Sequence, residues 1–410
     1  MKRLFILLSA IVFCGYGCSI QELVVAEETQ LVVAATSIDE ALLLDVGVVE
    51  FDSGIPENNR PEKTGIYEDI RLAEAKYIPY HLKTTLQGAG HWGAVRVIPS
   101  ASAYTDVIVS GSIIQSDGEY VELQMIVTDA TGRHWFTRNY ETQTGLTSYS
   151  KRRDRRRDPS QKVFNDFAND LQQHAAIMPR KQLQQTRQIS ELQFFSDMSP
   201  AAYNGYLTED EEGITTVARL PAENDPSVSR MRQIRERDRL VVDTLNEHYA
   251  NFYYGIAIPY RNWRKNSRAE SVKYRQEKRS ALTQALVGVV VLAGSTQINT
   301  NTSSRNTNNI NRALQYQGIS RGLDTVYGAL MRNREAGLHL DAITELSESF
   351  GNEAAPMVVS VEGQERRLTG TAEAQFESWR QLLRNIYEAE TGFSSSVEVG
   401  APARAPEPTG

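Results

Sequence analysis

One segment near the N-terminus most constrains how this chain can fold, because its residue pattern changes from strand to helix and back to strand. The run Leu42–Phe51 is apolar and rich in β-branched residues, and a turn-forming Asp-Ser-Gly ends it, as expected for a buried strand. Apolar residues at helical spacing follow over Ile66–Leu86, where we expect Pro79 to kink or divide the helix. Alternation over residues 94–98 predicts a second strand.

Three more strands are predicted between residues 106 and 140, joined by two tight turns. Asp117-Gly118 and Thr131-Gly132 separate the alternating segments, and glycine tolerates the positive φ of a tight reversal. The predicted order is β-α-β-β-β-β, with the helix on one face of the sheet. The fold class is therefore α+β, with a small N-terminal α/β sandwich followed by a mainly helical C-terminal region.

The first eighteen residues have the pattern of an export signal. Lys2 and Arg3 precede an apolar run over residues 4–13, which is too short to span a bilayer, and the small residues of Gly15-Tyr16-Gly17 precede Cys18. This segment resembles the signal of a bacterial lipoprotein precursor. The resemblance implies that Cys18 receives a lipid such as palmitate and becomes the mature N-terminus.

Two details refine this interpretation. Gly15 stands where the lipoprotein family usually has Leu, Val or Ile, so the alternative is ordinary cleavage after Gly17 and release of a soluble periplasmic protein. Ser19 follows the cysteine, which by the same resemblance favours the outer membrane, with the protein facing the periplasm. Several acyl chains would hold the protein firmly, because each buried methylene contributes about 0.8 kcal/mol.

The predicted α/β segment has a resemblance of its own. The stretches VGVVEFDSG and DVIVSGSI, with DGEYVELQMIVTDATGRHWF after them, give residues 42–140 a pattern similar to the small α/β domain of envelope lipoproteins. These include the curli-secretion lipoprotein, the lipoprotein activators of cell-wall synthases, and the N-terminal domain of the Tol translocation protein. A shared fold does not by itself carry a function.

Changes of composition divide the chain into six parts. A stripe of apolar residues at helical spacing begins near residue 227. We expect it to form core and to be interrupted by Pro259; its members are Met231, Ile234, Leu240, Val241, Leu245, Tyr249, Phe252 and Ile256. The expected organisation is a signal peptide over 1–17, a tether over 18–36, an α/β domain with a trailing helix over 37–178, a connector over 179–226, a mainly helical domain over 227–392 with a flexible loop at 295–311, and a disordered tail over 393–410.

Two segments are candidate contact sites. A basic run is a candidate anion-binding site, although a solvated loop is the simpler interpretation; its arginines are Arg152, Arg153, Arg155, Arg156 and Arg157. The apolar segment Ala281–Gly294 predicts a buried core helix, because fourteen residues fall short of a membrane span. Because it contains alanine and glycine, this segment would also suit close contact with a membrane or a second copy; the candidate contact residues are Ala285, Gly288, Val290 and Gly294.

Composition excludes some functions. The only cysteines are Cys14 and Cys18, so the mature chain has no pair for an internal disulfide. The net charge is -7, which argues against nucleic acid as a partner. The histidines lack the spacing of a zinc site, and we expect no metal and no cofactor; the six are His81, His91, His134, His174, His248 and His339.

The sequence contains no recognisable catalytic motif, so we expect a protein that is not an enzyme. The expected function is an outer-membrane lipoprotein that acts as an adaptor or scaffold in an envelope assembly, with a protein partner or a homo-oligomer. One alternative is an enzyme acting on cell-wall or surface glycan, for which acid pairs such as Asp45 and Glu50 would be required. A further alternative is an oligomeric secretion or pore component, suggested by Ala281–Gly294.

Overall fold

The structure is a computed structural model and describes residues 28–61, 65–99, 104–145, 148–150, 157–222, 224–295, 341–345, 357–361 and 364–391. For residues 273–295 it gives the course of a helix only. The predicted signal peptide, Cys18, the arginines at 152, 153, 155 and 156, the flexible loop beyond residue 295, and the tail lie outside the described residues.

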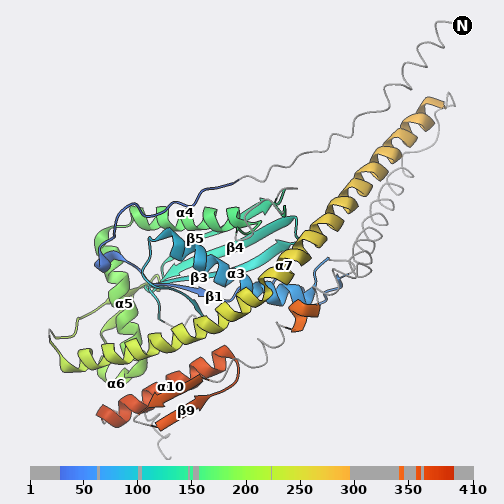
Figure 1. Ribbon diagram of the computed structural model, residues 1–410. Coiled ribbons are helices and arrows are strands. Elements are labelled where there is room, and N and C mark those ends of the chain that lie inside the picture. The colour runs from blue at the N-terminus through green and yellow to red at the C-terminus, as the bar shows by residue number, and fades with distance from the viewer. Residues whose placement is uncertain are drawn as a thin grey trace, which may run out of the picture.

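A five-stranded mixed sheet forms the centre of the molecule, in the order β2-β1-β3-β4-β5 (Figure 1). Strand β1 pairs in parallel with both β2 and β3, whereas β3, β4 and β5 form an antiparallel meander. The strands are β1 (Val46–Val49), β2 (Val95–Ile98), β3 (Val107–Ser116), β4 (Tyr120–Asp129) and β5 (His134–Gln143). With α3 (Glu68–Ala89) between β1 and β2, this arrangement confirms the predicted β-α-β-β-β-β order and the α+β class.

The two predicted reversals are confirmed by backbone geometry. Gly118 has a φ of +82° between β3 and β4, and Gly132 has a φ of +84° between β4 and β5. Both values lie in the left-handed region, where only glycine avoids a steric cost. The meander is therefore fixed locally by its turns.

Helices α3 and α4 (Gln161–Ile177) pack together and cover one face of the sheet. Strand β4 directs Val121, Leu123, Met125 and Val127 into this core. Helix α4 corresponds to the trailing helix expected at the end of the α/β domain. Of the two outcomes expected at Pro79, a kink or a division of the helix, the division is wrong, because α3 is continuous. Burial of Ile78 and Tyr80 on either side of the proline offsets the lost backbone hydrogen bond.

The segment that we expected to be a connector, residues 179–226, is largely structured, so this prediction is corrected. It contains α5 (Arg180–Met198), the short α6 (Pro200–Tyr203) and a hairpin of β6 (Leu207–Glu209) and β7 (Thr215–Val217). Helix α5 buries Ile189, Leu192 and Phe195, which follow one another at helical spacing. The prolines and glycines that indicate an irregular connector stand after residue 199, beyond the end of this helix.

A single helix, α7 (Pro226–Ser295), runs diagonally across the molecule in Figure 1 and is about 105 Å long at 1.5 Å per residue. Pro259 lies inside it and does not interrupt it, because packing of Ile256 and Tyr260 on the body holds the turns on both sides. The predicted core stripe is confirmed except for Leu240, which is 66% exposed. Its neighbour Val241 faces the core, and adjacent residues on a helix point about 100° apart.

The C-terminal elements pack beside the beginning of α7. A hairpin of β8 (Met357–Val361) and β9 (Gln364–Leu368) precedes α10 (Ala372–Thr391). The apolar face of α10 is buried; its residues are Phe376, Trp379, Leu383, Ile386 and Tyr387. Most of the buried apolar residues, from β1 to α10, form one continuous cluster.

Part of the predicted tether is docked on the body, which corrects another expectation. Asn165 and Asn169 of α4 donate to the carbonyl oxygens of Thr29 and Gln30, at 2.7 and 2.9 Å. The Asn169 side-chain oxygen also accepts from the Val32 backbone, at 2.8 Å. These side-chain amides form hydrogen bonds with the extended backbone of residues 29–32, as a neighbouring strand would. Residues 29–32 are therefore held along α4 and do not form a free linker.

Candidate functional site

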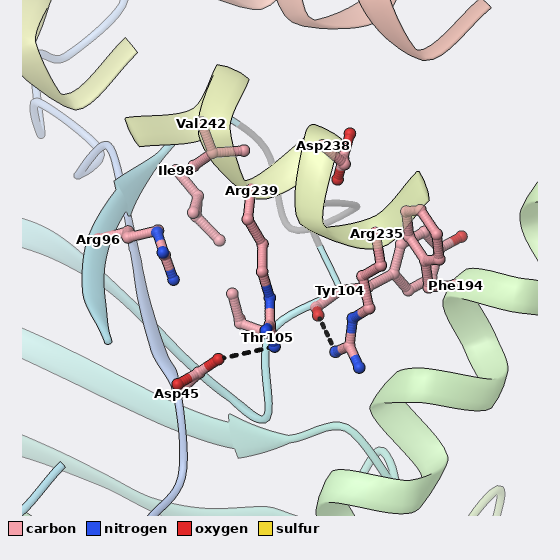
Figure 2. Close-up of a pocket in the computed structure, with 10 residues that line it drawn as sticks. All are labelled: Asp45, Arg96, Ile98, Tyr104, Thr105, Phe194, Arg235, Asp238, Arg239 and Val242. Atoms are coloured by element: carbon pink, nitrogen blue, oxygen red, sulfur yellow. Dashed lines mark hydrogen bonds and ion pairs between the residues drawn. The ribbon is translucent and has the colours of Figure 1, made fainter. Parts of the chain in front are cut away.

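Two adjoining cavities lie at the amino ends of the parallel strands, between α5 and α7. The inner cavity has a volume of about 20 Å³, room for a water molecule, and its lining is drawn in Figure 2: Asp45, Arg96, Ile98, Tyr104, Thr105, Phe194, Arg235, Asp238, Arg239 and Val242. The outer cleft has a volume of about 520 Å³ and is lined by Ala41, Asp106, Gln184, Arg187, Gln188, Glu191, Arg232, Arg235, Glu236 and Arg239. Arg235 and Arg239 belong to both.

Two aspartates form the floor of these cavities. Asp45 and Asp106 immediately precede β1 and β3. The Asp45 carboxylate accepts from the backbone N–H of Ala94, and that of Asp106 accepts from the backbone N–H of Asp45, both at 2.8 Å. Burial raises the pKa of Asp106, while the hydrogen bond from Asp45 opposes this rise. Both carboxylates therefore hold the starts of the strands in place through hydrogen bonds. The arginines next to them face the cavities.

Three arginines of the outer cleft have carboxylate partners. Arg239 of α7 contacts Asp45 at 3.0 Å, as Figure 2 shows, and it contacts Glu236 at 2.8 Å. Arg232 forms a two-pronged pair with Glu191 of α5, at 2.9 and 3.2 Å. On the α5 wall, Arg187 Nε lies 3.9 Å from the Asp106 carboxylate, and the Arg187 side chain also donates to the backbone oxygen of Glu40.

Arg235 differs from these three, because no carboxylate of the described residues lies within 4.0 Å of it. Its Nη2 donates to the Tyr104 carbonyl oxygen at 3.2 Å and to Ser190 Oγ at 2.7 Å, and both acceptors are neutral. Figure 2 shows the guanidinium beside the Tyr104 carbonyl oxygen. Burial lowers the pKa of Arg235, and the nearby charge of Arg239 lowers it further.

The chemistry of this arrangement favours binding of an acceptor. Guanidinium groups only donate hydrogen bonds, and two glutamine amides of α5, Gln184 and Gln188, add further donors to the cleft wall. The cleft lies at the amino ends of the parallel strands, opposite the edge where ligands of open α/β sheets usually bind. Its donors come instead from α5 and α7.

A second polar cluster, which we call the α3–α7 clasp, is closed to solvent. It consists of Glu74, Tyr77, His81, Asp158, Tyr260 and Arg264. Arg264 binds Asp158 through two hydrogen bonds, at 3.1 and 2.7 Å. The Glu74 carboxylate accepts from Tyr260 at 2.6 Å and from Ser116 at 2.5 Å. The clasp thus joins α3, α7 and the start of α4 through buried polar contacts.

Electrostatics differ between the two carboxylates of the clasp. Burial disfavours the charge of Asp158, but the charge and hydrogen bonds of Arg264, together with His81 and the Ser160 backbone, outweigh burial and hold the pKa of this carboxyl well below its usual value. Burial raises the pKa of Glu74, and one of its oxygens has no hydrogen-bond partner among the described residues. Burial also lowers the pKa of His81, whose ring contacts Tyr253 and Gln161 at 2.7 and 2.9 Å.

The residues singled out from the sequence lie elsewhere. Arg157 is the only arginine of the basic run within the described residues, and it pairs with Glu28 at 3.2 Å, near the docked segment. Ala285, Gly288, Val290 and Gly294 fall in the last turns of α7, where only the helix course is described. Asp45 and Glu50 lie at opposite ends of β1, so the structure does not bring this acid pair together.

The cleft was not predicted from the sequence, although α7 carries a signal for it. Arg232, Arg235 and Arg239 are spaced at i, i+3 and i+7, so they share one helix face. Their partners outside α7 come from the segments before β1 and β3 and from α5, which no local pattern connects to α7. The arginine spacing alone predicts a basic stripe on a helix and gives no indication of a cavity.

Within the described part of the chain, no helix is long and apolar enough to cross a membrane, and no group of three His, Cys, Asp or Glu side chains could hold a metal ion. Comparisons of the chain with protein-family models, with curated proteins and with solved structures give no match.

Proposed function

We propose that the protein is a non-enzymatic, lipid-anchored adaptor of the outer membrane that faces the periplasm and uses α7 to contact a partner or a second copy of itself. The observation that carries this proposal is the course of α7. Ser267 donates to the Asp117 carbonyl oxygen at 2.8 Å, and Arg268 donates to the Thr144 carbonyl oxygen at 3.1 Å. The helix then continues for 27 residues to Ser295, or about 40 Å.

The attachment of α7 to the α/β body supports its use as a rigid arm. The clasp holds its middle, and Asn246 binds both backbone groups of Val97 on β2, at 2.8 and 2.9 Å. A helix fixed at several points transmits its orientation to its far end. In Figure 1 that far end, coloured gold, lies well beyond the strands.

The composition of the far end supports contact with another helix. Ala281–Gly294 is apolar and contains five alanine or glycine residues, which allow two helices to approach closely. A second copy of this chain or an envelope partner would cover this segment. Lipidation at Cys18 would hold the adaptor at the membrane surface without a spanning helix.

Assembly can be tested with full-length protein extracted in detergent. We expect light scattering after size exclusion to report an oligomer or a complex, and Ala285→Arg to shift the protein to the monomer, because a charged side chain prevents close helix contact. Ala201→Arg, at an exposed position on α6, is the matched control. A monomeric wild type that forms no crosslinks, together with release of sugars from cell-wall material, would favour the enzyme alternative.

The anchor has a separate test. Intact mass of the native product should show cleavage before Cys18 and added acyl mass, and Cys18→Ser should abolish both. A product cut after Gly17 without acyl mass would replace the lipid anchor with simple secretion.

A further inference from the structure

The outer cleft has the dimensions of a small-molecule site. Its volume of about 520 Å³ lies within the usual range of ligand pockets, and its walls come from two helices that are packed into the same core. Donors line both walls: the α7 wall carries Arg232, Arg235 and Arg239, and the α5 wall carries Arg187 and Gln188. The cleft is therefore preformed and rich in donors.

Arg235 is the residue whose unused hydrogen-bond donors a ligand would fill. A guanidinium has five N–H donors, and only Nη2 of Arg235 has partners among the described residues. The charges of Asp106, Glu191 and Asp45 act on Arg235 from beyond 4.0 Å and only partly offset the cost of its burial, because no carboxylate is in direct contact with it. An oxyanion in the cleft would supply that contact and accept two parallel hydrogen bonds, the geometry in which arginine binds phosphate and carboxylate most strongly.

The acidic residues of the cleft limit the size of the ligand. Asp106 accepts from the Asp45 backbone, and Glu191 and Glu236 are engaged by Arg232 and Arg239. These carboxylates keep the neighbouring arginines in place and would repel a long polyanion. A single oxyanion group between Arg187 and Arg235 avoids that repulsion.

We infer that the outer cleft binds a small molecule through a phosphate or carboxylate group, with Arg235 as its main ligand and Arg187 and Arg239 flanking it. This inference does not depend on the adaptor proposal, because it concerns the α/β body and not the far end of α7.

Calorimetric titration of the full chain in detergent tests the inference, using inorganic phosphate in one arm and citrate in the other, at constant ionic strength set with chloride. We expect saturable binding of at least one probe at millimolar concentration, and the arm that binds identifies the group recognised. Arg235→Gln should weaken binding roughly tenfold or more, because a charge-assisted contact is lost. Arg230→Gln, an exposed arginine on the same helix, should leave binding unchanged.

Two results would overturn the inference: no saturable binding of either probe to the wild type, or equal binding by the wild type and the Arg235→Gln variant. If circular dichroism shows that Arg235→Gln does not fold, Arg187→Gln on the opposite wall serves instead and should also weaken binding.

Discussion

The clasp and the outer cleft are both polar, contain arginine and lie between α7 and the α/β body, yet their charges are arranged differently. In the clasp, Arg264 and Asp158 are each only 4% exposed and bind each other in a two-pronged pair. In the cleft, Arg235 has neutral acceptors only, and the pairs around it are partly exposed. The comparison indicates that a buried arginine paired with a carboxylate holds helices together. An arginine that contacts only neutral acceptors keeps hydrogen-bond donors available to a ligand.

The largest effect is expected from breaking the buried pair. Asp158→Ala leaves the Arg264 charge buried without a partner, and we expect it to lower the free energy of unfolding by about 3–5 kcal/mol. Chemical denaturation followed by circular dichroism measures this loss. The double variant Asp158→Leu with Arg264→Met should lose less than the single variant, because it leaves neither charge of this pair buried without a partner. Equal losses would mean that the pair does not hold α7 as described.

An uncharged contact of the same helix should have an intermediate effect. Asn246→Ala removes both hydrogen bonds to Val97, and we expect a loss of about 1–3 kcal/mol because two buried backbone groups lose their partners. Thr244→Ala, at an exposed position two residues earlier, should change stability by less than about 0.5 kcal/mol. Similar values for both variants would show that the edge of β2 does not depend on this amide.

The clasp should also respond to acid through His81. Because burial lowers the pKa of His81 in the folded state, the unfolded chain binds a proton first as pH falls below 6.5, and stability is lost in that direction. The contribution is at most about 1.4 kcal/mol for each unit of pKa difference. We expect the stability difference between wild type and His81→Gln to change between about pH 7.5 and pH 5.5, in unfolding curves at both values. A constant difference would contradict a neutral, buried imidazole.

The smallest effect is expected in the cleft. Glu191→Gln removes an exposed pair with Arg232, which we expect to lower the free energy of unfolding by about 0.2–1 kcal/mol. Salt screens exposed pairs, so this difference should shrink as sodium chloride is added, while the cost of Asp158→Ala should persist. Denaturation curves at low and high salt make that comparison. A loss as large as that of Asp158→Ala would erase the distinction between the two regions.

Local signals in the sequence predicted much of the fold. The glycine turns at Gly118 and Gly132 and most of the core stripe of α7 follow from backbone and helix geometry that neighbouring residues alone determine. Pro79 and Pro259 misled the prediction, because contacts with distant elements outweigh the local cost of proline in a helix. Leu240 was assigned to the core since its neighbours are apolar, although its angle on the helix points it to solvent.

The cleft could not be predicted in the same way. Asp45, Asp106, Arg187 and Arg235 come from four separate segments, and only the packing of α5 and α7 against the ends of the strands brings them together. The same holds for the clasp, where Glu74 meets Tyr260 across 186 positions of the chain. Sites assembled from distant segments depend on tertiary contacts that periodicity does not report.

The docking of residues 29–32 on α4 sets how far the body could stand from a bilayer. If Cys18 is acylated, the chain from Cys18 to Glu28 covers ten residue steps, which reach about 35 Å when fully stretched. A connecting segment of that length would keep the sheet within roughly one protein diameter of the lipid headgroups. The partners of this protein would then be limited to those that also reside close to the membrane.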